Sequence, residues 1–138
     1  MNTEANKAIV RRYQEALNAD DLDALDEIVA QDLHTPDMLP GFPTGLEGAK
    51  RIHQATRAAW PDFRITIEDL VAEGDLVAAR ITLSGTAAHP AFGLPGSGNT
   101  FEVAGMYFVR IAHGKIVEHR GLEDAASLMK QIIGESPP

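Results

Sequence analysis

The segment Gly114-Lys-Ile-Val-Glu-His-Arg-Gly-Leu-Glu-Asp124 runs directly into a helical pattern that ends near Ile133, and this junction is the most informative feature of the chain. The segment predicts a strand to about Leu122, and Asp124 stands where the N-cap of the next helix is expected. The strand therefore carries His119, Arg120 and Asp124 to a point where side chains can project into an enclosed cavity. We expect the chemistry of the protein at this junction.

Upstream of the junction, apolar residues recur with a period of two. The alternation predicts strands from Phe63 to a hairpin turn at 73–75, over 76–85, and over 101–111. A Gly- and Pro-rich loop over 87–99 separates the second strand from the third, and the turn 112–114 leads into the junction strand. The second half of the chain is therefore predicted to be an antiparallel sheet.

The first half has helical periodicity. A helix capped by Asn2 or Thr3 is predicted to about Asn18, and a short helix follows Asp20 or Asp21. Prolines in the segment 31–45 predict an irregular rim there, and a third helix is expected over 46–59, before Trp60-Pro61. Three helices, a curved antiparallel sheet and a last helix indicate one α+β domain over residues 1–138.

Composition restricts the function classes. The 138 residues include no cysteine, which excludes disulfides and thiol catalysis, and a formal net charge of -8 disfavours nucleic acid as a partner. Apolar runs are too short to span a membrane, and the first residues do not form a secretory signal. We therefore expect a cytoplasmic protein.

The order of elements and several local strings resemble the SnoaL-like polyketide cyclase and ester cyclase group of the nuclear-transport-factor-2-like superfamily. The strings are Asn6-Lys-Ala-Ile-Val-Arg-Arg-Tyr13, Asp21-Leu-Asp-Ala-Leu-Asp-Glu-Ile-Val-Ala30, Pro40-Gly-Phe-Pro-Thr-Gly-Leu-Glu-Gly48, Ala58-Ala-Trp-Pro-Asp-Phe-Arg-Ile65, Val71-Ala-Glu-Gly-Asp-Leu-Val-Ala-Ala79 and Gly114-Lys-Ile-Val-Glu-His119. The resemblance implies a cone-shaped fold with a cavity between a concave sheet and the helices. It does not fix the function, because this superfamily holds enzymes, binding modules and dimerisation domains.

The resemblance places Asp124 at the acidic residue that serves as acid/base in cyclases of this group, which close a ring by intramolecular aldol chemistry. Such a reaction needs a base and a delocalised enolate but no cofactor. An apolar pocket would raise the pKa of this carboxyl toward the working range. The alternative is that Asp124 only caps the last helix.

His119 and Arg120 are adjacent on a strand, so only one of them can face the cavity. Relatives often have tryptophan in place of Arg120. This arginine could hold an anionic or enolate oxygen, or it could pair with Asp124. His119 is either a site residue or a surface or interface histidine.

Four further residues are candidate substrate contacts: His34, His53, Trp60 and Tyr107. His34 begins the rim, two residues before the usual position of a family histidine. The other three carry a ring that is expected to point inward, where each is either a ligand contact or part of the core. Met38 and Leu39 on the rim could close over a ligand or pack on a partner subunit.

No metal site is predicted, because the five histidines lie on different elements without a metal-binding spacing. The leading hypothesis is therefore a cofactor-independent enzyme that acts on a small, largely apolar carbonyl compound by acid/base proton transfer. Isomerisation or hydrolysis could use the same pocket. The competing hypothesis is a non-catalytic binding or dimerisation module; an enclosed Asp124 favours the enzyme, and a solvent-facing Asp124 or a filled cavity favours the module.

The predicted sheet also indicates an oligomer. Helices on only one side of a curved sheet leave apolar residues on its other face, which a second copy of the chain can cover. We expect a homodimer.

Overall fold

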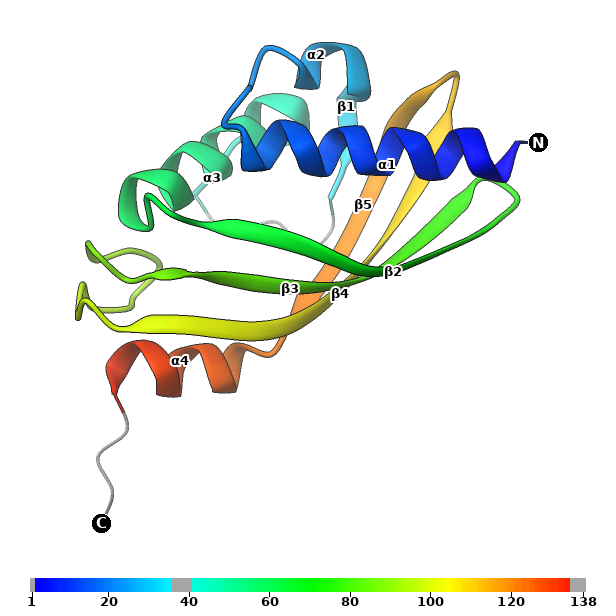
Figure 1. Ribbon diagram of the computed structural model, residues 1–138. Helices are drawn as coiled ribbons and strands as arrows, with labels where there is room; N and C mark the ends of the chain where they lie inside the picture. The colour runs from blue at the N-terminus through cyan, green and yellow to red at the C-terminus, as the bar shows by residue number, and fades with distance from the viewer. Residues whose placement is uncertain (1, 36–40, 135–138) are drawn as a thin grey trace.

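A computed structural model describes residues 2–35 and 41–134. The sheet is five-stranded and strongly curved, with the order β1-β5-β4-β3-β2. Helices α1 (Thr3–Asn18), α2 (Leu25–Ile28) and α3 (Gly45–Ala59) lie together over the sheet, and α4 (Ala125–Ile133) lies along β4 away from α1 (Figure 1). The predicted α+β fold of the nuclear-transport-factor-2-like type is confirmed.

The strands of the meander follow the predicted order. They are β2 (Arg64–Glu73), β3 (Leu76–Thr86), β4 (Thr100–Ala112) and β5 (Lys115–Glu123), all antiparallel to their neighbours in this series. The β4–β5 turn has positive φ at both His113 and Gly114, as a two-residue hairpin with the right-handed twist of strands requires. The role of His113 is thus to form this turn.

The structure corrects the prediction of a wholly irregular rim over 31–45. Strand β1 (Val29–His34) enters this segment and pairs in parallel with β5, with Val29 opposite Ile116. A short edge strand of this kind is stabilised by its partner in the sheet, so its own sequence gives little signal. Helix α2 is also shorter than predicted, because Val29 belongs to this strand. Met38 and Leu39 lie outside the described residues.

Helix α4 covers an edge of the sheet. The pairing of β5 with β4 ends at Glu123, so Glu102 of β4 lies beyond it. The side chain of Gln131 on α4 accepts from the backbone N–H of Glu102 and donates to its C=O. Helix α4 thus satisfies backbone groups that a sixth strand would otherwise pair. Its buried residues Leu128 and Ile132 face inward.

Two apolar clusters form the core. The larger cluster lies between the helices α1 and α2 and the sheet, and it includes Val10, Leu25, Val77 and Val109. The smaller surrounds Trp60 and closes the end of the fold near α4; it contains Ala59, Trp60, Ala87, Phe101, Val103, Leu128 and Ile132. The interior of the cone is therefore largely packed with side chains.

Candidate functional site

An aromatic and polar cluster lies inside the cone, on the face of β4 and β5 that α1 covers. The rings of His119 and Tyr107 are stacked with centroids 4.8 Å apart, and the Tyr13 ring of α1 lies 6.1 Å from His119. Two residues that the sequence predicted as site candidates, His119 and Tyr107, are therefore in contact. We call Tyr13, Gln14, Tyr107 and His119 the inner cluster.

The stack depends on the residue at position 121. Gly121 lies opposite Tyr107 in the sheet register, on the same face as His119. A Cβ atom at this position would lie 3.3 Å from His119 Cε1 and 3.4 Å from Tyr107 Cβ. The missing side chain leaves room for the imidazole ring to lie over the phenol.

Both tyrosines of the inner cluster are neutral. Burial raises the pKa of Tyr13 to about 12, and burial together with the nearby Tyr13 raises the pKa of Tyr107 further above its ordinary value. Neutral phenols are hydrogen-bond donors. The Tyr107 hydroxyl donates to Gln14 Oε1 at 3.2 Å, so its proton is already bound within the protein.

Sequence reasoning missed Gln14. It stands on the buried stripe of α1 between Val10 and Leu17, and it is only 4% exposed. A polar residue at an otherwise apolar position of a helical stripe was the available signal.

The structure decides between His119 and Arg120. His119 pairs with Val109 on the inner face, whereas Arg120 pairs with Phe108 on the outer face and donates to Glu118 Oε1 at 3.0 Å. Arg120 therefore does not face the cone, and it forms its ion pair with Glu118, not with Asp124. The suggestion that Arg120 holds a substrate oxygen in the cavity is corrected.

Asp124 is the N-cap of α4, and its carboxylate accepts from Ser127 N–H at 3.0 Å. The residue is exposed, so it lacks the apolar surroundings that an enclosed base would have. It lies three residues beyond Gly121, or about 10 Å along an extended chain. Asp124 thus lies at the exposed start of α4, outside the inner cluster.

Trp60 lies in the smaller core cluster and does not belong to the inner cluster. Its ring meets Phe101 at 4.9 Å and Phe92 at 5.6 Å between centroids, both edge-on. An open apolar groove of about 630 Å³ runs beside it, lined by Phe42, Ala55, Ala58, Ala59, His89, Pro90, Ala91 and Phe92. The structure gives Trp60 a packing role in the smaller core cluster, against Phe92, which lines this groove.

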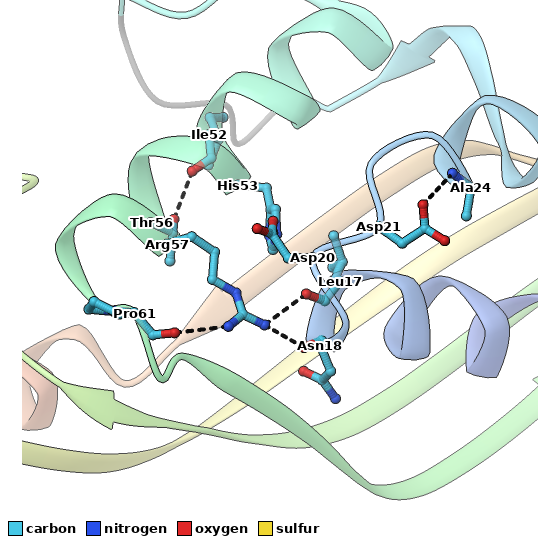
Figure 2. A network of polar contacts seen from close by, with 10 residues as sticks. All are labelled: Leu17, Asn18, Asp20, Asp21, Ala24, Ile52, His53, Thr56, Arg57 and Pro61. Atoms are coloured by element: carbon cyan, nitrogen blue, oxygen red, sulfur yellow. Dashed lines mark hydrogen bonds and ion pairs between the residues drawn. The ribbon is translucent and has the colours of Figure 1, made fainter.

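His53 belongs to a separate polar network between α3 and the end of α1 (Figure 2). Its Nε2 lies 3.0 Å from Asp20 Oδ1, and the ring is 6% exposed. Burial lowers the pKa of His53, and the neighbouring Asp20 opposes this shift. His53 thus holds two helices together and lies apart from the inner cluster.

His34 ends β1 at the edge of the sheet. It is exposed and stands opposite Glu118 in the register with β5, one position before His119. The structure therefore places it beside the site strand but outside the cone. Of the predicted residues, only His119 and Tyr107 are brought together.

Within residues 2–35 and 41–134, no three histidine or acidic side chains gather in a way that could hold a metal ion. No helix in the same ranges combines the length and the apolar character needed to cross a membrane.

The fold and the inner cluster define a cone-shaped α+β protein whose interior carries acid/base and hydrogen-bonding groups. The chain belongs to the SnoaL-like polyketide cyclase family, whose profile matches residues 7–132. This membership supports a cyclase-like function.

Individual relatives agree with this assignment. The chain is 28% identical over 136 residues to aklanonic acid methyl ester cyclase DauD of Streptomyces sp. (strain C5), with 94% of this chain and 82% of DauD covered. Among solved structures, TsrD from Streptomyces laurentii superposes with a TM-score of 0.87 at 27% identity, covering 96% of this chain and 97% of TsrD. IdmH from Streptomyces antibioticus superposes with a TM-score of 0.80 at 33% identity, covering 94% of this chain and 99% of IdmH.

Proposed function

We propose that this protein is a cofactor-independent cyclase that acts on a small, largely apolar carbonyl compound by acid/base proton transfer. The observation that carries the proposal is the inner cluster. It contains a histidine stacked on a neutral tyrosine inside a fold whose family is a cyclase family.

The proposed reaction is an intramolecular aldol addition. A base removes a proton from a carbon flanked by carbonyl groups, the resulting enolate carbon attacks a ketone of the same molecule, and the new alkoxide takes up a proton. One C–C bond forms and no redox step occurs, so proton transfer and oxygen binding suffice. We assign the proton transfer to Asp124 and the binding of an oxygen to the inner cluster with His119.

A substrate that reaches from the start of α4 to the inner cluster would contact both groups. It would also cover the exposed side chain of Asp124. When the substrate excludes water from a carboxylate, the interaction of that carboxylate with a nearby proton becomes stronger. This arrangement accounts for a base that lies at the exposed start of α4.

The direct test uses aklanonic acid methyl ester, the compound named in DauD, as substrate. The product of an aldol addition has the mass of the substrate, so chromatography with mass detection separates turnover from hydrolysis. We expect a new isomer with the wild-type protein and none with a Tyr107→Phe and His119→Gln double variant. An isomer formed equally well by both proteins would refute the proposed site.

The alternative is a binding or dimerisation module without catalysis, and both the exposure of Asp124 and the packed interior favour it. A module would bind the ester and release it unchanged, and Asp124→Asn would not alter its affinity. Mass detection of the recovered ligand separates the two functions.

We further propose a homodimer formed through the outer face of the sheet. Val71, Met106, Phe108 and Leu122 are 49–78% exposed, and the strand register brings them together on this face. Ion pairs Arg80–Asp69 and Arg120–Glu118 flank them. An apolar centre with a charged rim is the usual composition of a protein interface.

A further inference from the structure

Gln14 carries a buried hydrogen-bond donor without a protein partner. The side chain is 4% exposed, and within residues 2–35 and 41–134 no group accepts from its Nε2. Leaving a buried amide N–H unpaired destabilises a protein by about 1–3 kcal/mol. A glutamine at this point of the apolar stripe of α1 therefore needs a reason other than packing.

The orientation of the amide is fixed by Tyr107. Gln14 Oε1 accepts the Tyr107 hydroxyl at 3.2 Å, so the oxygen side of the amide faces β4 and the N–H₂ side faces away from that bond. The Tyr107 ring is in turn held by its stack on His119. The amide nitrogen is thus a fixed donor within the inner cluster.

We propose that Gln14 is a specificity-determining residue whose Nε2 donates a hydrogen bond to a carbonyl or enolate oxygen of the substrate, with Tyr107 positioning the amide. This inference rests on the proposed function, and it names the ligand chemistry that the inner cluster selects. Because the donor is enclosed, an oxygen reaches it only by displacing packed groups. A strong acceptor such as a conjugated carbonyl or an enolate offsets that penalty. A hydrocarbon gains nothing from the donor, so it binds more weakly and its affinity does not depend on Gln14.

The test uses two probes of similar size, benzoylacetone, a 1,3-diketone, and butylbenzene, which has no oxygen. Dissociation constants are measured by NMR titration for the wild-type protein and for Gln14→Met, which keeps the length of the side chain and removes its donors. We expect Gln14→Met to weaken benzoylacetone binding by about tenfold or more, as the loss of one buried hydrogen bond implies, and to leave butylbenzene unchanged. In the wild-type protein, the Gln14 side-chain amide resonance should shift with benzoylacetone only.

Tyr107→Phe is the control for positioning. It removes the bond that orients the amide, so benzoylacetone binding should weaken, but less than in Gln14→Met. The double variant should bind no more weakly than Gln14→Met alone, because both changes act through one amide. Melting curves of the three variants establish that they are folded; the double variant removes both partners of the bond and should be at least as stable as Tyr107→Phe.

Three results overturn the inference: no binding of benzoylacetone to the wild-type protein, equal loss of both probes in Gln14→Met, or no loss of either. Failure of the proposed function looks different. In that case, the ester would not be cyclised, while the preference for benzoylacetone over butylbenzene would persist and would still depend on Gln14.

Discussion

At the scale of single residues, Asp124 combines a structural position with a proposed chemical role. The change Asp124→Asn separates them, because asparagine is nearly isosteric and is also a good N-cap. We expect the melting temperature to stay near that of the wild type and turnover of the ester to fall by at least about 10²-fold, as for the loss of a general base. Asp124→Ala is the control: it should lower both turnover and the free energy of unfolding, the latter by about 1 kcal/mol. Unchanged turnover in Asp124→Asn would leave Asp124 as a cap and direct the search for a base to His119.

Gly121 gives a second prediction at this scale. The change Gly121→Ala puts a methyl group 3.3 Å from His119 Cε1, which is a tight contact, so the imidazole must shift over Tyr107 by a few tenths of an ångström. Since small displacements of positioned groups reduce turnover by up to about 10²-fold, we expect a clear loss of activity with little change in melting temperature. The ring displacement can be followed by the NMR shifts of the His119 ring protons. Retained stacking and full turnover would show that the inner cluster tolerates the extra methyl group.

At the scale of elements, Arg57 of α3 supplies the charge that α1 lacks at its C-terminus. The last turn of α1 has no basic residue, and the guanidinium of Arg57 donates to the carbonyls of Leu17 at 3.1 Å and Asn18 at 2.5 Å, and also to Pro61 at 3.0 Å (Figure 2). Positive charge at a helix C-terminus is favourable. We expect Arg57→Met, which keeps the aliphatic stem, to lower the free energy of unfolding by about 1–3 kcal/mol. Chemical denaturation measures this free energy. The control is Arg51→Met, because Arg51 forms only an exposed i,i+4 ion pair with Glu47; this variant should change the free energy of unfolding by less than about 0.5 kcal/mol.

His53 predicts how the contact between α1 and α3 responds to pH. Its pKa in the folded protein is lowered from 6.5, mainly by burial, so the unfolded chain binds more protons as the pH falls through the range just below 6.5. The stability contributed by neutral His53 is therefore complete above about pH 6.5 and is lost as the pH falls toward the folded-state pKa. We expect the melting temperature to drop more between pH 7.5 and pH 5 in the wild type than in His53→Gln. Equal drops in the two proteins would assign the pH dependence to other groups.

At the scale of the whole molecule, the outer face of the sheet predicts the state of association. A glutamate in place of Leu122, the most exposed of the four apolar residues of this face, would bring two carboxylates into the apolar centre of a symmetric dimer. We expect light scattering to give a dimer for the wild type and a monomer of about half that mass for Leu122→Glu. The control Gln54→Glu adds the same charge on α3, away from this face, and should remain a dimer. A monomeric wild-type protein would refute the proposal.

Most of the fold could be predicted from local patterns in the sequence. Helix periodicity, the caps at Asn2 and Asp124 and the alternation of β2 to β5 are local properties, and each predicted an element that the structure contains. Strand β1 was missed because its pairing with β5 joins segments far apart in the chain. The alternation of side chains along β5 showed that only one of His119 and Arg120 can face the cone, but it could not show which one.

The candidate site, in contrast, depends on contacts between elements that are distant in the sequence. The choice of His119 over Arg120 follows from the register of β5 against β4, and the contact between Tyr107 and Gln14 joins residues 93 positions apart. The exposure of Asp124 follows from the way α4 leaves β5 to cover the edge of β4. Periodicity fixes which face of its own element a residue occupies, whereas the groups that meet across the interior depend on how separate elements pack.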